Sequence, residues 1–208
     1  MVAGRNGTER GLLDILKAVY VERVALGRAT PASIGKRLGE SQASIRSAIG
    51  EASAKKLVKV KAGSVELTAE GRGRLKVVML GGAFEVIHPG HLHAFSEAKG
   101  LGNTLVVVVA TDESVQRNKG RHPVTGQASR VELVSSLRQV DLALPGNKGS
   151  IYDILARIRP DVVALGYDQR HNGGEIVREA AKRGVKIGTA RLGSPVPGVK
   201  TSKILLSL

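Results

Sequence analysis

The feature that most constrains the fold of this chain is an apolar, strand-like run that leads directly into a glycine-containing loop and the start of a helix. The run is Val77–Leu80, the loop contains Gly81, Gly82 and Gly90, and an amphipathic stretch begins at His91. Glycines let backbone N–H groups approach an anion, and the N-terminus of a helix adds positive potential. The segment therefore predicts an anion site at the carboxyl end of a buried strand in an α/β sheet.

Similar apolar runs alternate with helical patterns through the rest of the chain. The consecutive apolar residues 105–109 are typical of a parallel strand that is covered on both faces. Strands are expected at 76–80, 104–110, 142–144, 161–165 and 185–189, and helices at 91–99, 128–140, 150–158 and 174–183. The alternation predicts a doubly wound, Rossmann-like α/β domain over residues 75–208, with its site at the carboxyl ends of the strands.

The first third of the chain has a different pattern, which indicates three helices. Apolar residues with helical spacing over Leu12–Val19 predict the first helix, and Leu26 would extend the same face. Thr30, which precedes a proline, predicts the N-cap of a short second helix that ends at Gly39. A third helix would begin at Ser41. Its inner face would hold Ile45, Ala48, Ile49 and Ala52.

A small hairpin is expected after the third helix. Residues 57–61 and 64–68 alternate in the manner of strands, and the pair Ala62-Gly63 between them suits a tight turn. Three helices followed by a hairpin predict a small winged helix-turn-helix domain over residues 1–74.

The charge of the chain favours a polyanionic partner. The 208 residues carry a formal net charge of +14, and residues 1–76 hold 15 lysines and arginines against 7 aspartates and glutamates. A strongly basic balance suits nucleic acid or a nucleoside triphosphate, and adaptation for solubility is the alternative.

In a winged helix, the third helix would enter the major groove of double-stranded DNA and the hairpin lysines would contact phosphates. The residues expected to contact DNA are Gln42, Ser44, Arg46, Ser47, Lys59 and Lys61. A packing or dimerisation role is the alternative for this domain, and a homodimer is left open.

Composition excludes several other classes of protein. The chain contains no cysteine, which excludes disulfides, zinc–thiolate sites and cysteine catalysis. No run of 18 apolar residues and no secretory leader is present. We therefore expect a cytoplasmic protein with no membrane partner.

The loop after the first α/β strand carries a resemblance to a known family. Residues 82–91 resemble the G-x-F-D-x-x-H-x-G-H motif of the cytidylyltransferase-like nucleotidyltransferases, which join a nucleoside triphosphate to a phosphorylated alcohol and release pyrophosphate. The resemblance implies that His88 and His91 are catalytic and donate hydrogen bonds to phosphate oxygens. It also implies a nucleotide-binding loop that contains Gly82, Ala83, Phe84 and Gly90. Glu85 departs from the usual Asp and Ala83 from the common Thr or Ser.

Two further segments resemble parts of the same family. Residues 118–123 resemble its basic loop, in which Lys119 would be catalytic and Arg121 would bind substrate; a solvated basic loop is the alternative. Arg130, in the next helix, resembles a recurrent position with a packing or pairing role. Gly-Tyr-Asp-Gln at 166–169 resembles a string of the archaeal-type FAD synthases. Tyr167 would stack on a ring, while a base or acceptor would be bound by Asp168 and Gln169.

The segment 198–204 resembles the phosphate-binding element near the end of the family's domain. Thr201, Ser202 and Lys203 would hold the β- and γ-phosphates. A Mg²⁺ ion is expected on the triphosphate, and no residue is assigned as its ligand.

The resemblance implies the reaction more firmly than the substrate. The preferred hypothesis is an FAD synthase, which moves AMP from ATP to riboflavin 5′-phosphate. One alternative is a CTP-dependent cytidylyltransferase that acts on glycerol 3-phosphate or a similar polar phosphate. The other is a DNA-binding regulator in which the enzyme-like domain senses a flavin or nucleotide.

Overall fold

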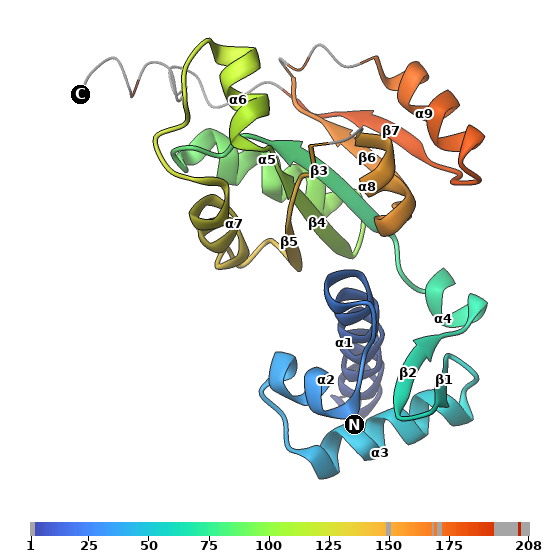
Figure 1. Ribbon diagram of the computed structural model, residues 1–208. Coiled ribbons are helices and arrows are strands. Elements are labelled where there is room, and N and C mark those ends of the chain that lie inside the picture. The colour runs from blue at the N-terminus through green and yellow to red at the C-terminus, as the bar shows by residue number, and fades with distance from the viewer. Residues whose placement is uncertain (1–2, 149–150, 168, 170–171, 194–203, 205–208) are drawn as a thin grey trace. The chain divides into compact units, whose positions relative to one another are not determined.

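The computed structural model describes residues 3–148, 151–167, 169, 172–193 and 204 (Figure 1). The chain divides into two compact units, Met1–Leu75 and Lys76–Leu208. Among the described helices, none has the length and apolar character needed to cross a bilayer.

Three helices make up most of the first unit. They are α1 (Ala3–Leu26), α2 (Pro31–Leu38) and α3 (Gln42–Ala54). The hydroxyl of Thr30 accepts from the backbone N–H of Ser33, and Gly39 ends α2 in the left-handed conformation with φ 68°. Ser41 caps α3 in the same manner through the N–H of Ser44. These caps confirm the predicted boundaries of α2 and the predicted start of α3.

One expectation for α1 is wrong. Leu26 does not extend the buried face, because 67% of its surface is exposed. It is the last residue of α1, and Gly27 turns the chain away in the left-handed conformation with φ 79°.

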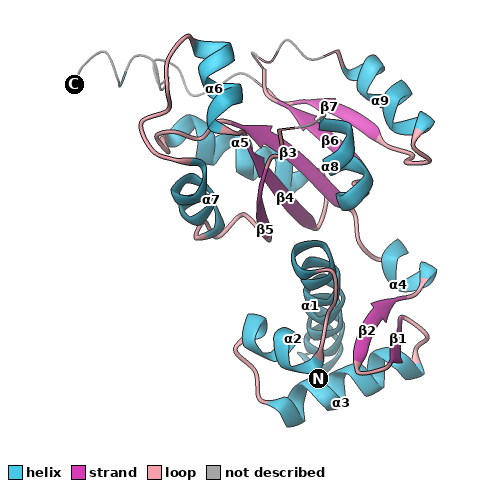
Figure 2. Cartoon of the chain, viewed as in Figure 1, coloured by secondary structure: helices cyan, strands magenta, loops and turns pink. Residues whose placement is uncertain are grey.

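The hairpin of the first unit consists of β1 (Val58–Lys61) and β2 (Ser64–Leu67), and α4 (Ala69–Gly73) follows it (Figure 2). Ala62 and Gly63 both have positive φ, which is the geometry that a two-residue hairpin turn requires. Ala29 forms an isolated antiparallel bridge with Val65, so the segment between α1 and α2 lies against the hairpin.

A five-stranded parallel sheet forms the centre of the second unit. Its strands are β3 (Val77–Gly82), β4 (Thr104–Val109), β5 (Leu142–Pro145), β6 (Val162–Leu165) and β7 (Gly188–Arg191), in the order β5-β4-β3-β6-β7. The order reverses between β3 and β6. In open parallel sheets, the crevice at such a reversal receives the ligand.

Among the described residues of this unit, five helices accompany the sheet. They are α5 (Pro89–Gly100), α6 (Asp112–Lys119), α7 (Gln127–Ser135), α8 (Ile151–Ile158) and α9 (Gly173–Lys182). Val78 and Leu80 of β3 join a core that includes Phe95 of α5 and Val134 of α7, so these helices cover one face. The other face of the sheet carries α8 and α9 (Figure 1).

Two helices, α4 and α6, were not predicted, the helix predicted at 128–140 ends at Ser135, and one strand is displaced. No helix was expected at Asp112–Lys119, although Thr111 caps it and Gly120 closes it with φ 71°. The last strand begins at Gly188 and not at Val185, because Gly188 is the first residue in register with β6. Val185 is instead buried ahead of the strand.

Candidate active site

The loop that follows β3 lies at the carboxyl edge of the sheet, beside the reversal of strand order. Its shape depends on Gly82 and Phe84. Phe84 has a left-handed φ of 50°, and its ring lies so close to Gly82 that a Cβ there would be 2.6 Å from ring atom Cζ. Glycine at position 82 leaves room for the Phe84 ring, which lets the loop stay compact as it enters α5.

The two predicted histidines meet at the start of α5. His88 is the N-cap residue, and its ring stacks on that of His91 with centroids 3.9 Å apart. The ring of Phe84 meets His91 edge-on, with centroids 5.3 Å apart. The Nδ1 atoms of both histidines are buried. Burial lowers the pKa of His88, so this imidazole is held neutral near pH 7.

Lys119 and Arg121 are bound by a buried carboxylate of the loop that follows β3. The side chain of Glu85 is fully buried and accepts from Lys119 Nζ, and from Arg121 Nη1 at 2.8 Å and Nη2 at 3.3 Å. Burial acts to raise the pKa of Glu85, but the hydrogen bonds from Arg121 and Lys119 outweigh it and lower this pKa below its ordinary value. Glu85, Lys119 and Arg121 together carry one net positive charge. They lie at the loop of residues 82–91, which we call the histidine loop.

Sequence reasoning missed this role of Glu85. It noted only that Glu replaces the usual Asp. The partners follow Glu85 by 34 and 36 residues, so only the fold brings them together.

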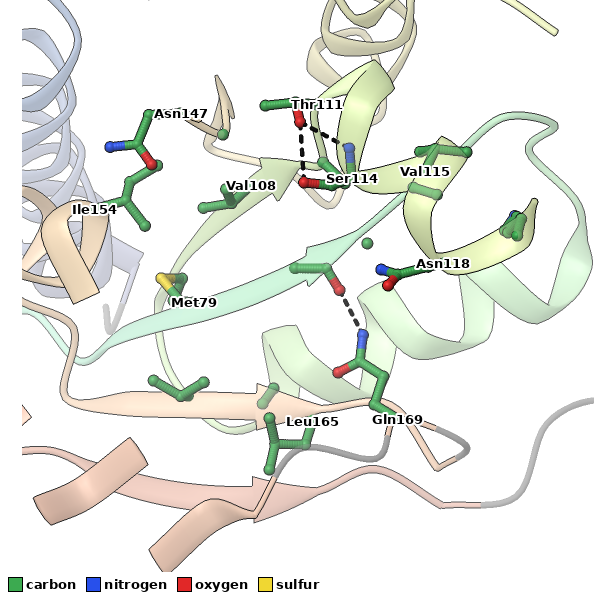
Figure 3. A pocket seen from close by; sticks show the side chains of 18 residues that line it. Met79, Val108, Thr111, Ser114, Val115, Asn118, Asn147, Ile154, Leu165 and Gln169 are labelled. Carbon is green, nitrogen blue, oxygen red and sulfur yellow. Dashed lines mark hydrogen bonds between the residues drawn. The ribbon is translucent and has the colours of Figure 1, made fainter. Parts of the chain in front are cut away.

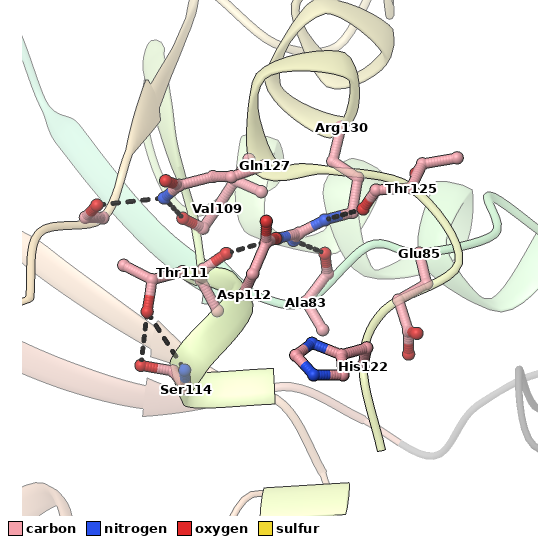
Figure 4. Close-up of polar contacts among 12 residues, drawn as sticks. Ala83, Glu85, Val109, Thr111, Asp112, Ser114, His122, Thr125, Gln127 and Arg130 are labelled. Atoms are coloured by element: carbon pink, nitrogen blue, oxygen red, sulfur yellow. Dashed lines mark hydrogen bonds and ion pairs between the residues drawn. The ribbon is translucent and has the colours of Figure 1, made fainter. Parts of the chain in front are cut away.

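Arg130 joins three segments of the site (Figure 4). Its side chain is fully buried and donates to the carbonyl oxygens of Ala83, Ala110 at 2.7 Å and Thr125 at 3.1 Å. It also pairs with Asp112 Oδ1 at 2.7 Å. One guanidinium thus fixes the loop after β3, the start of α6 and the entry to α7.

A pocket of about 840 Å³ opens at the carboxyl ends of the strands (Figure 3). Its lining includes the apolar side chains of Met79, Val108 and Leu165 and the polar residues Ser114 and Asn118 of α6. Lys119 and the backbone of residues 81–83 also border it. The arrangement offers an apolar floor, a polar rim and one cation.

Gln169 lies at the edge of the pocket, but its amide serves the backbone. Its Nε2 donates to Gly81 O at 2.8 Å, and its Oε1 accepts from Gly166 N at 3.1 Å. The side chain therefore joins the turn after β6 to the end of β3. Tyr167, in the same turn, is 37% exposed.

Four of the predicted residues cannot be placed in the structure. Asp168, Thr201, Ser202 and Lys203 lie outside the described residues. Gly90 follows Pro89 in the first turn of α5. Within the described ranges, no three His, Cys, Asp or Glu side chains gather in a group that could hold a metal ion.

The residues predicted to contact DNA lie in the first unit and are exposed. Those on α3 are Gln42, Ser44, Arg46 and Ser47, and those on β1 are Lys59 and Lys61. Lys59 forms an ion pair with Glu66 across the hairpin, with Nζ 3.2 Å from Oε2.

Comparison with known proteins extends this description. Residues 79–204 match the profile of the family described as Cytidylyltransferase-like. The FAD synthase of Thermococcus onnurineus strain NA1 is 41% identical over 140 residues, which cover 65% of this chain and 93% of that protein. The FAD synthase of Aciduliprofundum boonei is 44% identical over 115 residues, or 55% of this chain and 76% of that protein.

A solved structure is also similar. It is the crystal structure of the lipopolysaccharide core biosynthesis protein from Thermoplasma volcanium GSS1, with a TM-score of 0.56 and 37% sequence identity. The similarity covers 59% of this chain and 99% of that one.

Proposed function

The chain belongs to the cytidylyltransferase-like family and is a nucleotidyltransferase, and we propose that it is an FAD synthase, which transfers AMP from ATP to riboflavin 5′-phosphate. The observation that carries this proposal is the 41% identity to an archaeal FAD synthase over 93% of that protein's length. The chain's own site supplies the groups that such a transfer needs.

The reaction exchanges one phosphoanhydride bond for another. A phosphate oxygen of riboflavin 5′-phosphate attacks the α-phosphorus of ATP and forms a new P–O bond. The bond between that phosphorus and the β-bridging oxygen breaks, and pyrophosphate leaves with the electron pair. The enzyme has to hold two anions together and stabilise the charge that develops between them.

The histidine loop would act on the α-phosphate. His88 and His91 stand at the first turn of α5, where the helix N-terminus adds positive potential to their N–H donors. The backbone of Gly82, Ala83, Phe84 and Gly90 would complete the nucleotide-binding loop. A neutral His88 suits this role, because a neutral imidazole still donates through one nitrogen.

The cations held by Glu85 would receive the remaining phosphate charge. Lys119 and Arg121 keep 36% and 40% of their side-chain surface exposed while Glu85 binds them from inside, so both can also meet a phosphate. Thr201, Ser202 and Lys203 are proposed for the β- and γ-phosphates. Asp168 and Tyr167 are proposed for the base or the acceptor.

A divalent cation, with Mg²⁺ as the proposed ion, would neutralise charge on the triphosphate. The described residues offer no carboxylate cage for it. The triphosphate oxygens and water would therefore be its main ligands.

A pyrophosphate-release screen tests the proposal. ATP and CTP are each paired with riboflavin 5′-phosphate and glycerol 3-phosphate in the presence of Mg²⁺, and FAD is identified by chromatography. Release only with ATP and riboflavin 5′-phosphate is expected. Release only with CTP would replace the proposal with a cytidylyltransferase.

A second function, DNA binding by the first unit, is favoured by one specific observation. On α3, Ile45, Ile49 and Ala52 are buried, whereas Gln42, Ser44, Arg46 and Ser47 are exposed. An amphipathic third helix beside a hairpin that exposes Lys59 and Lys61 fits a winged helix whose polar face meets a duplex.

Fluorescence anisotropy of the full chain with a duplex from its own promoter tests this second function. Binding should weaken with salt, by a logarithmic slope of about −0.9 for each phosphate contacted. Arg46→Ala should weaken it, and Arg138→Ala, in the other unit, should not. Absence of binding at moderate salt would remove the regulator hypothesis.

A further inference from the structure

We infer that the pocket of Figure 3 binds the isoalloxazine ring system of riboflavin 5′-phosphate, on the face of the sheet opposite the core beneath α5, and that Asn118 reads the polar edge of this ring. The inference rests on the proposed FAD synthase activity. It says where the acceptor binds and which residue recognises its ring. We call this space the ring pocket.

Side chains alternate between the two faces of each strand, and this places the ring pocket on the opposite face from the core beneath α5. Val78 and Leu80 of β3 face the core that α5 and α7 cover. Successive side chains of a strand point to opposite faces, so Met79 faces the other way and lines the ring pocket. Val108 of β4 and Leu165 of β6 line it from the two neighbouring strands.

These side chains give the ring pocket an apolar floor, although less than 10% of the surface of each residue is exposed. Neighbouring strands are about 4.8 Å apart, so the floor from β4 across β3 to β6 is about 10 Å wide. A planar, fused aromatic system has the width and the apolar character to lie over such a floor. Glycerol 3-phosphate has no apolar surface to match this floor, and the pocket of about 840 Å³ is much larger than that small acceptor needs.

The rim of the ring pocket carries polar groups that suit one edge of a flavin. Thr111 and Ser114 already bond to each other, since Thr111 Oγ1 lies 2.9 Å from Ser114 Oγ. Asn118 lies one turn further along α6, and its amide makes no hydrogen bond with the other described residues. An amide offers both donors and an acceptor, which complements the alternating carbonyl and N–H groups of the pyrimidine edge.

Lys119, at the mouth of the ring pocket, determines which way round the acceptor binds. Lys119 borders the pocket and also contacts Glu85 in the histidine loop. Gly81 and Gly82 line the pocket between the floor and that loop. With the ring on the floor, the ribityl chain crosses this glycine edge and brings the phosphate to Lys119, beside His88 and His91.

Asn118→Leu in the full chain tests the inference, with Gln116→Leu as its matched control. Both residues are exposed on α6, but Gln116 does not border the ring pocket. Kinetic constants are measured separately for ATP and riboflavin 5′-phosphate, and riboflavin, which lacks the phosphate, is titrated by the quenching of its fluorescence. Circular dichroism checks that each variant is folded.

Loss of one hydrogen bond to the ring should raise the KM for riboflavin 5′-phosphate and the Kd for riboflavin about tenfold in Asn118→Leu. The KM for ATP should stay within twofold, and Gln116→Leu should match the parent. Riboflavin should compete with riboflavin 5′-phosphate and not with ATP.

Two results would overturn the inference while the FAD synthase activity stands. One is an unchanged KM for riboflavin 5′-phosphate in Asn118→Leu, and the other is competition between riboflavin and ATP. If the parent chain makes no FAD at all, the proposed function itself fails, which the parent assay shows before any variant is compared.

Discussion

Replacing Glu85 by Gln should destabilise the second unit, because a fully buried carboxylate binds two cations there. Glu85 accepts from Lys119 and, twice, from Arg121. Breaking a buried ion pair costs about 3–5 kcal/mol when the partner is left buried and unpaired. Lys119 and Arg121 are 36% and 40% exposed and can regain water, and Gln keeps one acceptor oxygen. We therefore expect a loss of about 2 kcal/mol in the free energy of unfolding at pH 7.

The loss should depend on pH in a defined direction. The pKa of Glu85 is lower in the folded chain than its ordinary value of 4.5. A depressed carboxyl pKa contributes stability that is present above the ordinary value and disappears as the pH falls through the folded value. The difference between the parent and Glu85→Gln should therefore be full at pH 7 and should shrink below about pH 4.5.

Urea unfolding followed by circular dichroism at pH 7 and at pH 3 measures both effects. Glu179→Gln is the matched control, because Glu179 also pairs with two cations of the same unit, Lys182 and Arg183, but 26% of its side chain is exposed. Its loss should be much smaller. Glu85→Asp, which keeps the charge, should recover most of the stability. An equal loss for the two Gln variants, or a Glu85→Gln loss that is unchanged at pH 3, would refute the reasoning.

Three further substitutions test other parts of the site. Arg130→Lys keeps the charge but loses the planar guanidinium that reaches four partners. The free energy of unfolding should therefore fall by about 3 kcal/mol in urea titrations. A loss below about 1 kcal/mol would contradict the anchoring role. His91→Ala should lower kcat by about 10²–10³ with a smaller change in KM, whereas His93→Ala, at an exposed residue that pairs with Glu97, should leave both unchanged. Thr111→Ala removes the N-cap of α6 and should cost about 1 kcal/mol in thermal or urea unfolding, while Thr125→Ala, whose side chain caps no helix, should cost less.

The order of strands and helices was predictable because local patterns encode it. The apolar run at 105–109 indicated a covered parallel strand, and Thr30, Gly39 and Ser41 marked helix ends that the structure confirms. The signals for α6 were also local, since Thr111 precedes two acidic residues and Gly120 follows the last turn. The basic loop predicted at residues 118–123 overlaps the last turn of this helix.

The contacts of the site were harder to predict because they join distant parts of the chain. Nothing in the sequence near Glu85 indicates its bonds to Lys119 and Arg121, which depend on how β3 and β4 are paired. Likewise, nothing in the sequence near Gln169 indicates that its amide is bonded to Gly81 and Gly166, and the assignment of this residue to the substrate stays a prediction. A motif indicates which side chains gather at a site, but the tertiary structure decides which of them remain available to a ligand.

The anchoring of the site by Arg130 has a consequence for how this protein can change over generations. Three of its four partners are main-chain carbonyl oxygens, at Ala83, Ala110 and Thr125, and these oxygens are present whichever amino acid occupies the position. The surrounding loops can therefore acquire new side chains, and with them new acceptor preferences, without losing their common point of attachment. Arg130 itself has no such latitude, because only a guanidinium reaches all of these oxygens at once.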